Sequence, residues 1–199
     1  MHVETLTLLK TVHLLAIAAA LGPAFAADAL LLTRGLLRPV TDATVEMLQF
    51  LAQLVLVGLV AVWATGIPLA LEVAKAHPEF LGNQKFWVKV AIVAVLSVNG
   101  LMVHRLVLPH LLGQVGRRLF DGCGTGQRLG LAAVGGVSLA SWTFPMLLGV
   151  AKELSYVVPA AQLLEAYGLA LAVAISGLSV VALAAAPAAP SITRKARQP

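Results

Sequence analysis

The sequence predicts an all-α, polytopic integral membrane bundle of five transmembrane helices, and three observations lead to this prediction. Of the 199 residues, 59% are hydrophobic and only 12% are charged, and the mean hydropathy is +0.91. An ordinary soluble domain is about 45–50% apolar and about 25% charged. The apolar residues also gather in long runs, and a spanning helix needs roughly 20 of them. This composition excludes a soluble enzyme, a disordered chain and a nucleic-acid-binding protein.

Five apolar runs are long enough to cross a bilayer. They cover residues 5–32, 45–71, 86–112, 129–150 and 163–186, with ends uncertain by several residues. Helix-breaking residues separate them: Pro39 follows the first run and His77-Pro78 follows the second. We expect a single transmembrane domain over residues 1–190 and a basic cytoplasmic tail over 191–199.

The distribution of Lys and Arg predicts the orientation, because cytoplasmic loops carry an excess of these residues. The side with the first and third loops and the tail holds Arg34, Arg38, Arg105, Arg117, Arg118, Arg128, Arg194, Lys195 and Arg197. The other side holds Lys10, Lys75, Lys85, Lys89 and Lys152. We therefore expect the amino terminus outside and the carboxyl terminus in the cytoplasm, in a bacterial-type cytoplasmic (inner) membrane. A cleaved secretory signal over residues 1–27 is the alternative, but the apolar run continues to Leu32, which favours a retained span.

Polar side chains within the spans are the candidate functional residues, because an ionisable group inside a bilayer is costly and tends to face the bundle interior. His13 lies roughly 12 Å below the outer end of the first span, and we expect an outer polar cluster around it. The other members expected there are Lys10, Lys89, Ser141 and Glu165. Lys10 precedes His13 by about one turn and so shares its helix face.

A second polar set falls in the cytoplasmic half of the spans. Its members are Asp28, Gln49, Gln53, Asn99 and His104. Asn99 and His104 are separated by about 140° around a regular helix, so both can face one narrow target only where the helix is distorted. We therefore expect the inner set to be less coherent than the outer one. The alternative roles are hydrogen bonding between helices for the amide side chains, and snorkelling to the head groups for Lys10 and Lys89.

His13 carries the chemical prediction. Imidazole is a good ligand for haem iron when its second ring nitrogen has a hydrogen-bond partner. Neither snorkelling nor an interfacial position explains a histidine so far along an apolar helix, which favours a ligand or proton-handling role over packing. Indoles favour the membrane interface, and the outer boundary is where we expect Trp63, Trp87 and Trp142.

Two segments resemble a known superfamily. They read Lys-Thr-Val-His-Leu-Leu-Ala-Ile at residues 10–17 and Phe-Trp-Val-Lys-Val-Ala-Ile-Val at residues 86–93. The pair is similar to a pattern of the HemJ-type protoporphyrinogen oxidases and of the related copper-resistance protein D (CopD) membrane domains. The helix end at residues 99–109 is similar to the copper-resistance branch. The resemblance implies a b-type haem (haem b), with His13 as axial ligand and Lys89 as functional cation. In this interpretation His104 either ligates a second haem or ligates none.

Three functions therefore stand open. The first is a haem-binding membrane redox protein, an oxidoreductase that transfers electrons with a quinone or oxidises a porphyrinogen. The second is a small transporter or permeation subunit for copper or another metal, with the buried His, Asp and Glu side chains as its pathway. Whichever metal is bound, His13 and His104 are the candidate metal ligands. The third is an accessory structural subunit of a membrane complex. The expected partners are the lipid bilayer, a quinone, and a second copy of the chain or a redox subunit.

Overall fold

The computed structural model describes residues 2–185 and confirms the predicted fold class. Five helices are long and apolar enough to cross a membrane: Glu4–Gly35, Asp42–Ala76, Gln84–Gly113, Thr125–Val150 and Ala160–Ala184. No strand occurs within residues 2–185. The protein is thus an all-α, five-helix membrane bundle. The basic tail at 191–199 and residue 186 of the last expected span lie outside the described residues.

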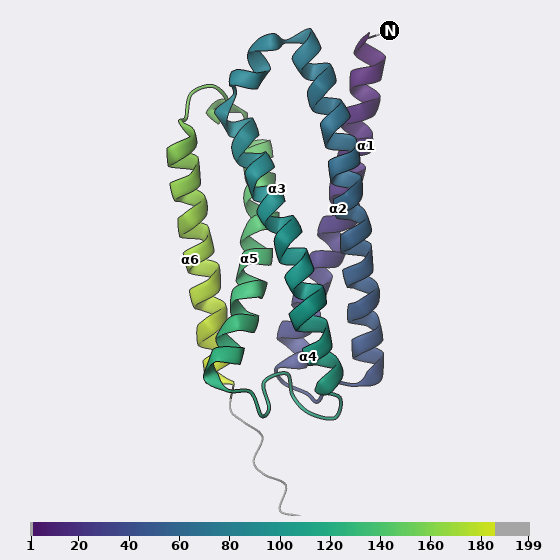
Figure 1. Ribbon diagram of the computed structural model, residues 1–199, viewed down its shortest axis with the longest axis vertical. Helices are drawn as coiled ribbons and strands as arrows, with labels where there is room; N and C mark the ends of the chain where they lie inside the picture. Colours follow the sequence, from purple (N-terminus) through teal and green to yellow (C-terminus); the bar gives the residue numbers. More distant parts are fainter. Residues whose placement is uncertain (1, 186–199) are drawn as a thin grey trace, which may run out of the picture.

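The helices form two antiparallel pairs with one helix between them (Figure 1). In chain order the elements are α1 (His2–Leu30), a π-helical turn (Leu31–Gly35), α2 (Asp42–Ala76), a 3₁₀ helix (Pro78–Gly82), α3 (Gln84–Met102), a π-helical turn (Val103–Val107), α4 (Leu108–Gly113), α5 (Thr125–Val150), a 3₁₀ helix (Lys152–Leu154) and α6 (Ala160–Ala184). The pair α1 and α2 lies on one side, α5 and α6 lie on the other, and α3 lies between. Following the expected orientation, we call the end near the amino terminus the outer end and the opposite end the inner end.

Polar caps make the helices longer than the apolar runs. α2 begins three residues before the expected span because the Thr41 hydroxyl accepts a hydrogen bond from the Thr44 backbone N–H at 3.2 Å. Asn83 caps α3 in the same way, accepting from the Lys85 backbone N–H at 3.1 Å. Hydropathy alone excludes such polar first turns.

A π-helical turn interrupts the third span just before a proline. Leu108 donates its backbone N–H to the carbonyl of Val103, five residues back. Pro109 has no N–H, and its ring clashes with the carbonyl four residues before it in a regular helix. A wider turn relieves such crowding locally. His104 is the second residue of this turn.

Glycines allow the closest approaches between paired helices. A Cβ built on Gly58 of α2 would lie 2.6 Å from the Cβ of Ala20 in α1, and Ala20 is fully buried. A Cβ on Gly136 of α5 would lie 2.8 Å from the backbone of Ile175 in α6. Because small residues let membrane helices pack backbone to backbone, these two positions hold the α1–α2 and α5–α6 pairs together.

Two buried cations tie helix ends together. The Lys85 ammonium donates to the carbonyl of Ala151 at 2.6 Å, which fixes the start of α3 against the end of α5. The Arg128 guanidinium donates to the carbonyls of Ala182 at 3.1 Å and Ala185 at 2.8 Å, at the end of α6. Arg128 is one of the cations that predict the orientation, but it is buried and satisfies the last carbonyls of a helix.

We expect Gly136→Ala to lower the free energy of unfolding by about 1–3 kcal/mol, the usual cost of overpacking. The added methyl group would press on the Ile175 backbone, which has no flexible end to move. Thermal unfolding in detergent measures the effect. The matched control is Gly130→Ala on the same helix, where a Cβ meets nothing within 4 Å. Equal stability of the two variants would contradict this packing.

Candidate functional site

The outer site centres on a hydrogen bond between α1 and α2. The His13 Nδ1 atom lies 2.8 Å from the Thr65 hydroxyl oxygen. The same hydroxyl donates its proton to the carbonyl of Ala61 at 2.7 Å. A hydroxyl has only one proton, so its oxygen must accept from the N–H at Nδ1. This hydrogen-bond network assigns the proton of neutral His13 to Nδ1 and leaves a lone pair on Nε2.

Gly66 gives the imidazole its space. A Cβ at Gly66 would lie 3.0 Å from Cε1 and 3.6 Å from Nδ1 of His13. The half-buried ring therefore lies against the α2 backbone, and the preceding residue, Thr65, contacts it through its hydroxyl. A side chain at position 66 would press on the imidazole, and the ring would have to shift to make room for it.

A cation from α3 completes the outer site. Lys89 is half-buried, and its charge acts on His13. Of the residues around His13, Thr65 and Gly66 lie against the ring, and Lys89 is near enough for its charge to act on the imidazole. The sequence did contain a signal for Thr65 and Gly66. They form a polar and small pair in an apolar span, and this pair lies nearly as many residues after the loop between α1 and α2 as His13 lies before that loop.

The other residues expected around His13 lie elsewhere. Lys10 is exposed on α1, and Glu165 is exposed on α6, which lies on the far side of the bundle from α1 (Figure 1). Ser141 is fully buried, and its hydroxyl lies 2.7 Å from the Tyr167 hydroxyl, so it links α5 to α6. Trp142, expected at the outer boundary, is instead buried in the core with Ala20. Depth along a helix does not determine which face a side chain occupies.

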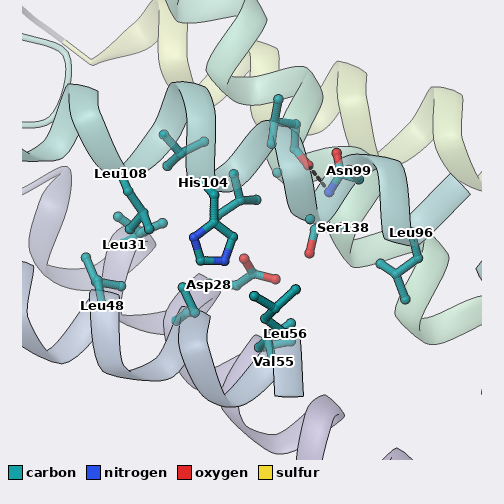
Figure 2. Close-up of a pocket in the computed structure, with 18 of the residues that line it drawn as sticks. Asp28, Leu31, Leu48, Val55, Leu56, Leu96, Asn99, His104, Leu108 and Ser138 are labelled. Carbon is teal, nitrogen blue, oxygen red and sulfur yellow. Dashed lines mark hydrogen bonds between the residues drawn. The ribbon is translucent and has the colours of Figure 1, made fainter. Parts of the chain in front are cut away.

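The inner polar residues meet at a cavity of about 120 Å³. Four polar side chains line it: Asp28, Asn99, His104 and Ser138. Figure 2 shows the Asp28 carboxylate and the His104 imidazole pointing toward one another into this space. The Asn99 amide donates to the carbonyl of Val134 at 3.2 Å, also drawn in Figure 2. Aliphatic side chains and Trp142 form most of the remaining wall.

The inner set is therefore more coherent than the sequence suggested. Asn99 and His104 line the same cavity, and His104 lies within the π-helical turn, a distortion of the kind that the spacing required. Ser138 had no signal in the sequence beyond being a hydroxyl in an apolar span. Within residues 2–185, no three His, Cys, Asp or Glu side chains are grouped to hold a metal ion. His13 and His104 thus belong to two separate sites.

The inner loop holds a third polar group, around His110 and Cys123. His110 Nε2 lies 2.8 Å from the carbonyl of Leu119, and Nδ1 lies 3.1 Å from the Gln127 amide nitrogen. Because a carbonyl only accepts and an amide nitrogen only donates, both ring nitrogens are engaged. The Cys123 sulfur lies 3.6 Å from Nε2, which carries a proton and cannot serve as a base. Burial, reinforced by the Asp121 charge, raises the pKa of Cys123 against the opposing charge of Arg128.

Comparisons of this chain with models of known families, with curated proteins and with solved structures find no match.

We expect Thr65→Val to lower the free energy of unfolding by about 1–3 kcal/mol, because the N–H at His13 Nδ1 would lose its acceptor. Thr143→Val is the matched control, since the Thr143 hydroxyl bonds only to the Leu139 carbonyl of its own helix. Thermal unfolding of both variants, alone and combined with His13→Leu, measures the interaction energy between His13 and Thr65 in a double-mutant cycle. Additive effects of Thr65→Val and His13→Leu would show that the two side chains do not interact.

Alkylation of Cys123 should be slow at neutral pH. The thiolate is the nucleophile, and a raised pKa keeps the thiol protonated up to higher pH. The rate of reaction with iodoacetamide should reach half its maximum at a higher pH than that of the same thiol in the denatured protein, and Cys123→Ser should abolish the reaction. A profile at or below that of the denatured protein would contradict the partial burial of Cys123.

Proposed function

We propose that this protein is a b-type haem-binding redox protein of a membrane, with His13 as an axial ligand. The observation that carries the proposal is the hydrogen bond from His13 Nδ1–H to Thr65. A histidine that ligates a metal characteristically donates its second N–H to an oxygen, which fixes the ring and increases the basicity of the ligating nitrogen. The resemblance of residues 10–17 and 86–93 to haem-binding membrane proteins supports the same assignment.

The donors of the outer site fit one face of a haem. His13 offers a neutral Nε2 lone pair, and the Lys89 ammonium suits a propionate carboxylate. A bound haem would supply a one-electron redox centre. Thr65 holds the imidazole in one orientation, and Gly66 leaves it room beside α2. The positive charge of Lys89 would favour the reduced form of a redox group bound beside it and so raise its reduction potential.

The electron partner that we propose is a lipid-soluble carrier such as a quinone. Large hydrophobic side chains are exposed along all five spans, which is the surface that a bilayer-dissolved partner meets. The excess of cations at the inner end supports a bacterial inner membrane with the amino terminus outside.

The absorption spectrum of the purified protein tests the proposal. Protein from cells supplied with iron should show a Soret band and a reduced-minus-oxidised difference spectrum. His13→Ala should abolish both, whereas His104→Ala should retain them because His104 lies at the separate inner cavity. Thr65→Val should keep the haem and change its midpoint potential. Haem-free protein, or an unchanged spectrum in His13→Ala, would refute the proposal.

A further inference from the structure

The inner cavity contains a carboxylate oxygen that the protein leaves without a partner. The Oδ2 atom of Asp28 is buried and accepts or donates no hydrogen bond within the described part of the chain. A buried polar group without a partner is strongly unfavourable, above all inside a membrane. Asp28 faces the cavity together with His104 and Ser138 (Figure 2). The carboxylate is therefore placed to interact with something that occupies this space.

Asp28 also lines a second cavity of about 100 Å³, which extends to the inner loop. This second cavity is bounded by Leu119 and Phe120 of the loop and by residues of α5 and α6. Asp28 thus lies where the two cavities meet, with the loop end on one side and His104 on the other. A small species entering from the loop end would reach Asp28 before His104.

The carboxylate and the imidazole face each other without direct contact. Among residues 2–185 the ion pairs within 4.0 Å are Lys75 with Glu72 and His77 with Glu79, so Asp28 and His104 are farther apart. One water needs roughly 10–15 Å³ of cavity volume and two to four polar partners. The cavity of about 120 Å³ and its four polar side chains meet both requirements.

We infer that Asp28 is a proton-binding residue that exchanges its proton with His104 through water in this cavity. The proton passes from the Asp28 carboxyl oxygen to a bridging water, and that water gives one of its protons to an imidazole nitrogen of His104. A carboxylate and an imidazolium result, so charge is conserved. The residues that line the two cavities come from α1, α2, the third span, the inner loop, α5 and α6. Asp28 and His104 are the only titratable side chains among these lining residues. This inference does not depend on haem binding.

Infrared difference spectroscopy of the full chain in lipid nanodiscs, titrated with pH, tests the inference. The C=O stretching band of a protonated carboxyl group should appear and disappear with pH and shift in D₂O. Asp28→Asn should abolish this band, whereas the control Glu46→Gln should retain it, because Glu46 is an exposed acid on α2. His104→Gln should move the midpoint of the titration by about one pH unit or more, as expected for coupled groups.

A second measurement holds even where Asp28→Asn does not fold. A hydrophobic carbodiimide reacts with protonated carboxyl groups, and mass spectrometry of the wild-type protein should locate the adduct at Asp28. The inference is overturned by a titrating band that persists in Asp28→Asn, by a midpoint that His104→Gln leaves unchanged, or by an unmodified Asp28. It is also overturned if Zn²⁺ alone removes the band at constant pH and His104→Gln prevents this, because the cavity would then bind a metal ion.

Discussion

The absence of water inside a bilayer governs this structure. Backbone groups are satisfied within the helices, and side-chain polar groups must find partners in the protein itself. Most of those in the spans do: Ser141 bonds to Tyr167, Lys85 to a carbonyl, and Asn99 to a carbonyl. Against that background, the buried Oδ2 atom of Asp28 is an exception, because it has no partner among residues 2–185. His13 bonds to Thr65 through Nδ1, which leaves the lone pair of Nε2 for a ligand. These two side chains are where we place function.

Both residues lie on α1, and a close approach of that helix to α2 lies between them. Ala20 packs directly on Gly58 of α2, with His13 toward the outer end and Asp28 toward the inner end. α1 is held chiefly by α2. The two sites therefore share one helical hairpin, and the packing of the bundle brings His104 of the third span to the inner one. A displacement of α1 along α2 would alter both.

Hydropathy was sufficient to predict the five spans, because a long apolar run in a membrane has few structural alternatives. Depth along the spans placed Lys89 at a level from which its charge acts on His13. It was insufficient for Ser141, Trp142 and Glu165, because the face that a side chain occupies depends on how neighbouring helices are rotated. Thr65 and Gly66 required knowledge of the α1–α2 register. The meeting of Asp28 with His104 additionally required a helix distortion that hydropathy does not encode.

The π-helical turn at Val103–Val107 carries a further consequence. A π turn holds one residue more than an α turn, so it is equivalent to a single-residue insertion in an otherwise regular helix. The chain beyond it is rotated relative to the chain before it, and Lys89 lies on the earlier part. Loss of one residue at this point would restore the regular helix and turn the inner segment while leaving the outer half in place. A change of one residue in the length of the third span would therefore rotate the side chains of its inner end only, and those of its outer end would keep their directions.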